Sequence, residues 1–378
     1  MTDAASHRQP LFDGLDRLKL GVFHMNCTRG ATPSTAEGTI SPLDWGQQVR
    51  IARLAEDAGL DAFIPIARWR GYGGPSGFND EQYEPIPWAA GLSALTERIA
   101  VFATAHVPLI HPVRLAKEVA TIDHISGGRF CLNVVAGWNK RELDMFGVDL
   151  VPQEERYEVA AEWTSFLERL WAEDEEFDVA GKYFRAERVL SAPKPIQRPR
   201  VPIMSAGSSP AGIAFAAAHA DICFAAANSP EDLQPLVARI KEAAAERGRT
   251  VSVWTQAGVL CGETEAEATR RYEHVVREQG DLEAVTNQMT MLMGGDSRTL
   301  DFALDPAMLE RMVAMQHAYQ LFGTPEQIVK EMQQLADIGI DGLALMWPDY
   351  ERGISEFRDQ VLPLAVQAGL RAGAQVQR

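Results

Sequence analysis

Short apolar runs alternate with amphipathic stretches along most of the chain, and this pattern predicts strands and helices in turn. Eight runs have strand length, and segments with apolar residues at helical spacing follow them. The predicted strands are 18–25, 61–67, 98–107, 129–137, 201–207, 220–226, 251–260 and 341–347. The predicted helices are 43–60, 87–96, 113–126, 154–172, 209–219, 230–247, 264–278, 325–339 and 354–370.

Strands that alternate with helices indicate a parallel sheet, and eight such units indicate that the sheet closes. The fold class predicted is therefore α/β, as a (β/α)8 TIM barrel. An open doubly wound sheet is the alternative, but eight units and the absence of a Rossmann glycine loop favour the barrel. We expect one barrel domain over residues 18–378, preceded by an N-terminal extension over residues 1–17.

Three connections are longer than an ordinary loop between a strand and a helix. They lie near 68–86, 174–200 and 279–323, and the middle one resembles a strand-turn-strand excursion. The last is rich in methionine and has a helical pattern. Insertions of this kind tend to cover the C-terminal face of a barrel, where active sites lie. The methionines either pack the insertion or form an apolar lid over a substrate.

Composition narrows the class of protein. A net charge of −16 without a basic run excludes nucleic acid as a partner. The four cysteines are scattered, so neither a zinc motif nor a disulfide framework is expected. The N-terminal stretch lacks the apolar core of a signal peptide, and no apolar run is long enough to span a membrane. We expect a cytoplasmic protein.

Polar residues at the C-terminal ends of barrel strands are the first candidates for a site. They are rich in amides, hydroxyls and aromatic rings and poor in carboxylates, which disfavours a metal-dependent hydrolase or a glycosidase. This mixture suits a planar heteroaromatic cofactor better. The candidates are His24, Asn26, Arg68, Arg70, Thr104, His106, Asn133, Trp138, Asn139, residues 205–209, Trp347, Asp349 and Tyr350.

The segment from Ser205 to Gly212 is the best candidate for an anion site, because a strand runs through small residues into a helix. Ser209 would cap that helix, with Pro210 in its first position. Capping alone also explains the serine, and both readings stay open. Arg156 on the preceding helix is a candidate second partner for an anion, although a lone helical arginine is more often solvated.

Two polar residues lie inside apolar strands. Asn133 interrupts an apolar run, and a buried amide needs either backbone partners or a ligand. Thr104 lies in the strand before it, where threonine is by default a structural β-former.

The fourth predicted strand carries a family resemblance. IDHISGGRF followed by LNVVAGWNKRELDMFG closely resembles the bacterial luciferase-like flavin monooxygenase superfamily. HPVRLAKEVATIDHIS and GIDGLALMWPDYERGISEFRDQVLPL also fit, so that the resemblance covers residues 18 to 370. The motifs RWRGYGG, ATAH, ERYE and AGSSPAG are most similar to the pyrimidine oxygenase and sulfone monooxygenase subgroup.

The resemblance implies a cofactor and a set of residues that contact it. FMN in its reduced form, FMNH2, is the implied cofactor, O2 the co-substrate, and Thr104 with Asn133 the implied oxygen pocket. On the substrate side the candidates are the strand-end residues His24, Asn26, His106, Trp138 and Trp347. The implied FMN contacts are Ala67, Arg68, Asn133, Glu142, Arg156, Tyr157 and Ser209.

The chain also departs from its apparent relatives. Luciferases proper have a histidine where the second strand ends, whereas this chain has Ala67 and Arg68, so light emission is not expected. The pyrimidine oxygenases have alanine and threonine near His106 and Val107, and proline at the position of His111. The resemblance therefore does not imply uracil as the substrate.

The resemblance implies a two-component enzyme. A separate NAD(P)H:flavin reductase supplies FMNH2, and the oxygenase uses it with O2 to oxygenate and cleave a small heterocycle, amide or sulfone. No nicotinamide fingerprint is present in the chain, and a homo-oligomer, dimer or tetramer, is implied. The rivals are an F420-dependent dehydrogenase on the same barrel and a flavin-binding protein without turnover.

Overall fold

Eight parallel strands close into a barrel in the structure, a computed structural model that describes residues 9–292 and 305–373. Each strand pairs with the next in chain order, and the eighth returns to the first. The (β/α)8 fold class predicted from the sequence is confirmed. The strands of the ring are β1 (Lys19–Phe23), β2 (Ala62–Ile64), β3 (Ala100–His106), β4 (Phe130–Val135), β7 (Ile203–Ala206), β8 (Ile222–Phe224), β9 (Ser252–Cys261) and β11 (Gly342–Met346).

Helices surround this ring, and polar residues cap several of their N-termini. Thr324 forms a capping box with Gln327, and Asp44, Ser229 and Thr264 each accept a backbone N–H of the first turn. Such caps satisfy amides that the helix itself leaves free. The helices are α1 (Trp45–Asp57), α2 (Pro85–Leu95), α3 (Pro112–Ser126), α5 (Gln153–Ala172), α6 (Pro210–His219), α7 (Pro230–Ala245), α8 (Glu265–Tyr272), α12 (Pro325–Asp337), α13 (Tyr350–Glu356) and α14 (Leu362–Gln367).

A tryptophan fills the barrel interior near the N-terminal ends of the strands. The Trp254 indole lies over Gly21 and Gly342, where an added Cβ would come within 3.1 Å and 2.2 Å of the ring. Phe102 and Met204 belong to the same inner cluster. The interior is thus a packed core, which leaves the C-terminal ends of the strands as the place where a site can form.

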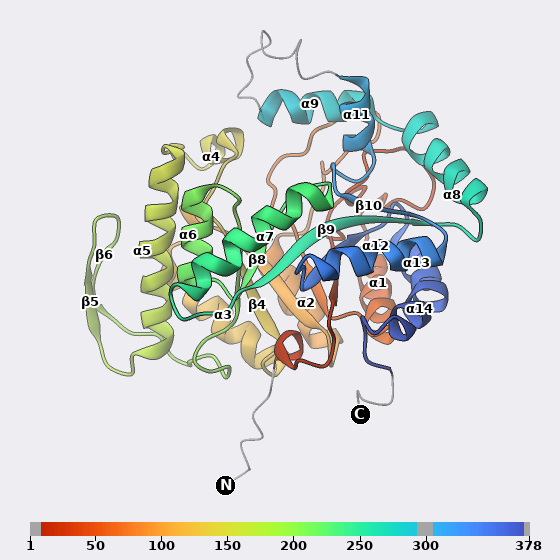
Figure 1. The fold of residues 1–378 in the computed structure, drawn as a ribbon. Helices are drawn as coiled ribbons and strands as arrows, with labels where there is room; N and C mark the ends of the chain where they lie inside the picture. The colour runs from red at the N-terminus through yellow and green to blue at the C-terminus, as the bar shows by residue number, and fades with distance from the viewer. Residues whose placement is uncertain (1–8, 293–304, 374–378) are drawn as a thin grey trace.

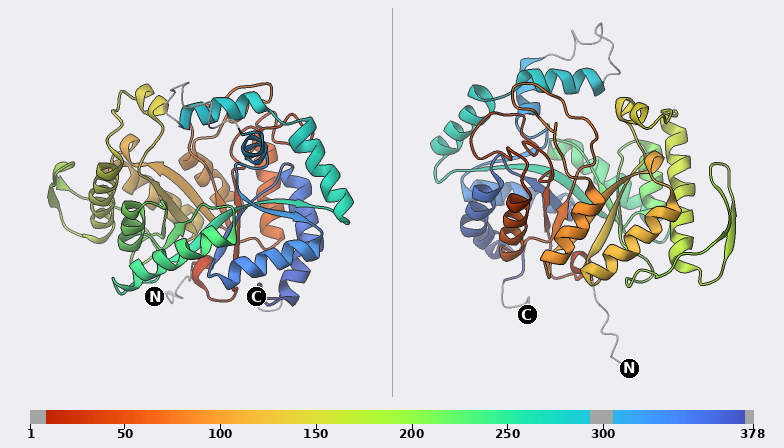
Figure 2. Two further views of the ribbon diagram at one scale, coloured as in Figure 1. Left: turned by 45° about the horizontal axis from the view of Figure 1, so that its top comes forward. Right: turned by 180° about the vertical axis from the view of Figure 1, so that it is seen from behind.

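The long connections carry additional elements. Residues 174–200 contain the antiparallel hairpin of β5 (Phe177–Ala180) and β6 (Arg185–Val189). The connection after α8 contains α9 (Leu282–Leu292) and α11 (Pro306–Val313), which lie beyond the C-terminal ends of the strands (Figures 1 and 2). Met289 and Met312 pack with Val285 and Val313 between these helices, whereas Met293 lies outside the described residues.

The same connection ends in a ninth strand, β10 (Tyr319–Gly323), which the helical reading of this region missed. β9 is ten residues long, and its first three residues pair with β8. Its last five residues, from Ala257 to Cys261, pair with β10 instead. β10 is therefore a strand because β9 extends beyond β8 and leaves an edge to be paired.

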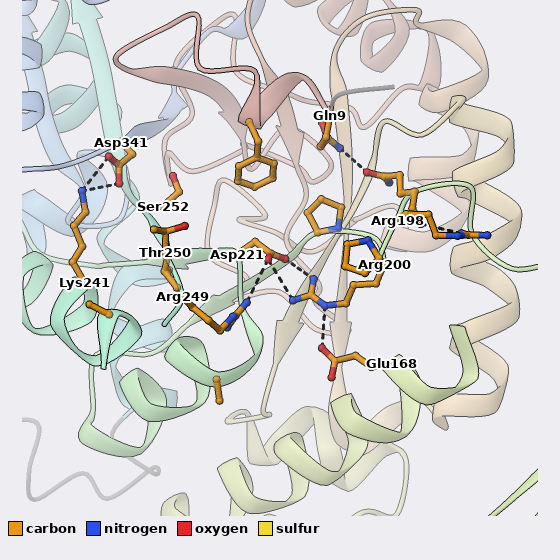
Figure 3. Close-up of a pocket in the computed structure, with 17 residues that line it drawn as sticks. Gln9, Glu168, Arg198, Arg200, Asp221, Lys241, Arg249, Thr250, Ser252 and Asp341 are labelled. Carbon is orange, nitrogen blue, oxygen red and sulfur yellow. Dashed lines mark hydrogen bonds and ion pairs between the residues drawn. The ribbon is translucent and has the colours of Figure 1, made fainter. Parts of the chain in front are cut away.

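A cavity of about 1060 Å³ lies at the N-terminal end of the barrel, beside the starts of β7, β8 and β9. Paired charges line it (Figure 3): Arg200 contacts Glu168 and Asp221, Arg249 contacts Asp221, and Lys241 contacts Asp341. Active sites of such barrels lie at the C-terminal face, and the N-terminal face usually serves stability. We therefore assign this network to folding.

No helix among the described residues could cross a bilayer.

Candidate functional site

Thr104 and Asn133 meet at the C-terminal ends of two neighbouring strands, where the register of β3 and β4 pairs them directly. The Thr104 hydroxyl donates to the Pro65 carbonyl at 2.6 Å, and the Asn133 amide donates to Thr104 Oγ1 at 3.0 Å. Asn133 Oδ1 is buried with no partner among the described residues. The two side chains are adjacent, as the sequence predicts. Because the Thr104 hydroxyl donates its hydrogen to Pro65, the N–H that remains free in the pair is the second one of the Asn133 amide.

Arg68 provides a cation whose charge reaches His106, two residues after Thr104 on the same strand. Its guanidinium lies 4.6 Å from the Trp138 ring centroid and 5.7 Å from that of Tyr72. Arg68 Nε is buried without a partner, and no carboxylate bonds to Arg68 within the described ranges. Cation–π contacts of this kind hold a guanidinium in place without neutralising it. The site therefore has a fixed positive charge available for a ligand.

Two histidines that face Arg68 are held neutral. Burial and the nearby Arg68 charge lower the pKa of His24 to about 3 and that of His106 to about 4. His24 follows β1 with a φ of 62° and packs its ring edge-on against Phe23 at 4.3 Å. Both imidazoles therefore act as neutral hydrogen-bonding groups at physiological pH.

These histidines predict an acid-sensitive fold. Because their folded pKa values lie below the ordinary value of 6.5, only the unfolded chain takes up these protons between about pH 4 and 6.5. Stability therefore falls as pH decreases through this window, by about 1 kcal/mol per histidine between pH 7 and 5.5. Urea unfolding at the two pH values should show this loss reduced by about 1 kcal/mol in His106→Asn. The exposed His274→Asn variant is the control, and equal losses in parent and His106→Asn would contradict the assignment.

Asn26, predicted to contact substrate, is instead used by the backbone. Its amide donates to the carbonyls of Ile66 and Tyr83 at 2.9 Å and 3.1 Å and accepts from the Ile66 N–H at 3.0 Å. Both N–H groups are thereby engaged. Asn26 thus positions the chain after β2 with both of its N–H groups, and its contact with a substrate stays a prediction.

Trp347 lies apart from the other candidates. It follows β11, where Met346 points into the barrel and Trp347 therefore points outward. Its ring packs against Tyr350 and Phe357, and Gly353 makes room for it, since a Cβ there would lie 2.2 Å from the indole. The ring packs against α13, while its indole Nε1 is buried without a partner among the described residues, and its contact with a substrate stays a prediction.

The chain after β4 brings a carboxylate and an amide into the site. Glu142, in α4 (Lys140–Met145), is buried and accepts the Trp69 N–H at 3.0 Å through one oxygen, while its other oxygen has no partner in the described part of the chain. Asn139, just before α4, is also buried, and neither its amide nitrogen nor its oxygen is bonded within the described ranges. Asn139 was noticed as a strand-end residue but not assigned to the site.

The predicted anion site joins α5 to the start of α6. Ser209 Oγ accepts the Gly212 N–H at 3.2 Å and caps α6. The Tyr157 hydroxyl lies against two glycines, since a Cβ on Gly207 or Gly212 would come within 2.3 Å or 2.8 Å of it. A helix N-terminus flanked by a tyrosine hydroxyl is suited to an anion. The close packing explains why this loop is glycine-rich.

Arg156 has a structural task beside this site. Its Nε donates to the Val151 carbonyl and its Nη1 to the Gly137 carbonyl, both at 3.0 Å. The guanidinium therefore ties together the two ends of the segment that contains α4. Its remaining N–H groups stay available for an anion.

A strained turn closes the mouth of the barrel on the side of the last long connection. Met315, Gln316 and His317 are consecutive non-glycine residues with φ of 58°, 61° and 58°. This conformation costs about 1–2 kcal/mol per residue, and such strain concentrates at functional sites. The turn brings Gln316 to Gln288 and His317 to within 2.7 Å of Asn228. No sequence signal indicated it, because glycine is the usual residue with positive φ.

The atoms without partners suit a planar heteroaromatic group with an anionic tail. Arg68, Asn133, Asn139 and Glu142 each have at least one buried polar atom that bonds nothing in the described part of the chain. Buried polar atoms are costly unless a ligand or water satisfies them. The α6 N-terminus supplies amides and a favourable dipole for the tail.

Comparisons with known proteins identify the family of the chain. The family described as luciferase-like monooxygenase matches residues 18–342. Pyrimidine monooxygenase RutA of Enterobacter sp. (strain 638) is 31% identical over 360 residues, which cover 92% of this chain and 96% of the relative. Among solved structures, riboflavin lyase RcaE aligns with a TM-score of 0.84 at 22% identity, over 94% of this chain and 92% of its own. DmoA from Hyphomicrobium sulfonivorans aligns with a TM-score of 0.82 at 20% identity, over 95% and 90%.

Proposed function

The chain belongs to the luciferase-like monooxygenase family and is a flavin-dependent monooxygenase, and from this premise we propose that it is the oxygenase of a two-component system that uses reduced FMN and O2. A separate NAD(P)H:flavin reductase would supply the reduced FMN. The observation that carries the proposal is the Thr104–Asn133 pair, on the strand whose His106 feels the Arg68 charge. The proposal includes a cytoplasmic homo-oligomer, a dimer or tetramer.

The residues divide between the two ends of the cofactor. Ala67, Arg68, Asn133 and Glu142 would hold the ring system, because their polar atoms or backbone line the mouth of the barrel. Tyr157, Ser209 and the free N–H groups of Arg156 would hold the phosphate. Reduced FMN, when bound, supplies the electrons that activate O2.

The chain's own groups then act on the charge that develops. Thr104 fixes the Asn133 amide, whose second N–H donates to an oxygen atom that gains negative charge. The Arg68 cation favours the same charge, since the stacked Trp138 ring keeps the guanidinium in place. Trp69 and Phe146, whose ring centroids are 4.9 Å apart, line a cavity that also contains Thr104 and would reduce the water around it.

The substrate we propose is a small, uncharged molecule with an amide, imide or sulfone group. Support comes from the neutral imidazoles of His24 and His106, which can donate and accept hydrogen bonds but do not attract a charge. The curated relatives act on pyrimidines by name, and a pyrimidine ring contains such amide groups. The face of the Trp138 ring opposite to Arg68 would stack against the ring of the substrate.

Dependence on a reductase tests the two-component proposal. The purified chain with FMN and NADH should not oxidise NADH, because we expect it to hold no nicotinamide site. Addition of an NADH:flavin reductase should produce oxygenation of heterocyclic amides or sulfones, detected by mass spectrometry. Rapid NADH oxidation without the reductase would contradict the proposal, and substrate conversion with F420 in place of FMN and without O2 would select the F420-dependent dehydrogenase.

A further inference from the structure

A cavity of about 460 Å³ lies between α2 and α3 and reaches the site from the side. At its inner end are Ala67, Thr104 and His106. Its walls are largely apolar and come from the start of α2, the chain after β3, and α3. These wall residues are Pro85, Ile86, Pro87, Ala90, Leu109, Ile110 and Ile122. We name this space the α2–α3 cavity.

The α2–α3 cavity is separate from the proposed cofactor contacts. Of those contacts only Ala67 lines it, together with Thr104 of the oxygen pocket. Arg68, Asn133, Glu142 and Tyr157 do not line it. The cavity therefore meets the site at Thr104 and extends away from the ring and phosphate positions.

The charged groups at the outer part of the cavity each have a partner, although Glu118 Oε2 is buried and bonds nothing among the described residues. Arg114 pairs with Glu118 at 2.8 Å, Glu84 accepts the Ile86 N–H at 2.8 Å, and Lys117 donates to the Ala192 carbonyl. A ligand that brought a charge here would have to displace one of these contacts. The walls and the rim thus both favour an uncharged, apolar occupant.

Two exposed aromatic rings border the same cavity. Trp69 and Phe146 line it and meet edge to face, yet 41% and 44% of their surfaces remain exposed. Large apolar side chains exposed beside a site commonly contact a ligand. A volume of about 460 Å³ is typical of pockets that hold a drug-sized molecule.

We propose that the α2–α3 cavity binds an uncharged apolar arm of the substrate, while the reacting head group lies at Thr104 and His106. The inference deepens the proposed function, on which it rests for the position of the head group. It assigns substrate specificity to residues of α2 and α3, with Ala90 and Ile86 as determinants of how long an arm is accepted. The preferred substrates are then larger than a free pyrimidine base.

Binding of two probes to the FMN-loaded protein tests this inference without turnover. We expect 1-hexyluracil to bind at least tenfold more tightly than uracil in calorimetry, because the hexyl chain leaves water for the apolar walls. Ala90→Phe fills the cavity and should remove this gain, with the affinities for uracil and FMN unchanged. Ala218→Phe is the matched control, since Ala218 lines the cavity at the opposite end of the barrel.

Each outcome decides the inference. Equal affinities of the two probes, no binding of 1-hexyluracil, or a gain that survives Ala90→Phe would overturn it. A change of oligomeric mass in Ala90→Phe would assign the cavity to a second copy of the chain instead. The protein could bind 1-hexyluracil more tightly than uracil, lose this difference in Ala90→Phe, and yet oxygenate no substrate. That result would support the cavity assignment while the proposed function fails.

Discussion

A Thr104→Val enzyme is expected to form product at least about tenfold more slowly than the parent, with its FMN affinity within about twofold. The substitution is nearly isosteric but removes the hydroxyl that bonds both Pro65 and Asn133. Asn133 then loses the acceptor that orients its amide and no longer presents a fixed N–H to developing charge. Oriented donors of this kind are worth about 2.7–4 kcal/mol when placed at such charge.

The measurement that reveals this loss is the fraction of consumed NADH and O2 that ends in oxygenated product. In the presence of the reductase, Thr104→Val should consume NADH and O2 but release H2O2 in place of product. Thr104→Ser retains the hydroxyl and should keep most of the activity. Thr255→Val is the matched control, because Thr255 is a buried threonine on another barrel strand whose hydroxyl bonds nothing among the described residues. Parent-like turnover with full coupling in Thr104→Val would place the oxygen pocket elsewhere.

Gly207→Ala should weaken FMN binding by about 1.5–3 kcal/mol, the scale of a lost charge-assisted hydrogen bond. The new Cβ would lie 2.3 Å from the Tyr157 hydroxyl and 3.1 Å from the Gly212 backbone, so that the tyrosine must move away from the α6 N-terminus. The phosphate would lose both the tyrosine and the aligned helix amides.

Riboflavin separates this effect from a general loss of structure. It lacks the phosphate, and its affinity for Gly207→Ala should stay close to that for the parent. Gly373→Ala is a suitable control, because the nearest atom to its Cβ is 3.7 Å away. Equal losses for FMN and riboflavin would show that Gly207 acts on the fold and that the phosphate lies elsewhere.

The barrel could be predicted because its determinants are local. Buried parallel strands read as apolar runs, and the spacing of the runs gave their number. The meeting of Thr104 with Asn133 also followed, since equivalent ends of adjacent parallel strands lie side by side. The cap at Ser209 was readable from a serine before a proline.

Other features depend on contacts that the sequence does not show. The five residues of β10 form a strand only because β9 extends beyond β8. Trp347 and Met346 differ by one position, and this parity decides that the tryptophan ring packs against Tyr350 and Phe357. The hydrogen-bonding groups of Asn26 are taken by partners from distant segments such as Tyr83. In the same way, Arg68 keeps its charge because its guanidinium lies over the ring of the distant Trp138 and not beside a carboxylate.

The most direct test of the account is turnover under labelled oxygen. With the reductase, NADH, FMN and an uncharged heterocyclic amide or sulfone that the enzyme accepts, product formed under 18O2 should carry one labelled oxygen atom. No such product should form when either the reductase or O2 is omitted. Product without label, or label that comes from H218O, would contradict the assignment of the Thr104–Asn133 site to oxygen activation.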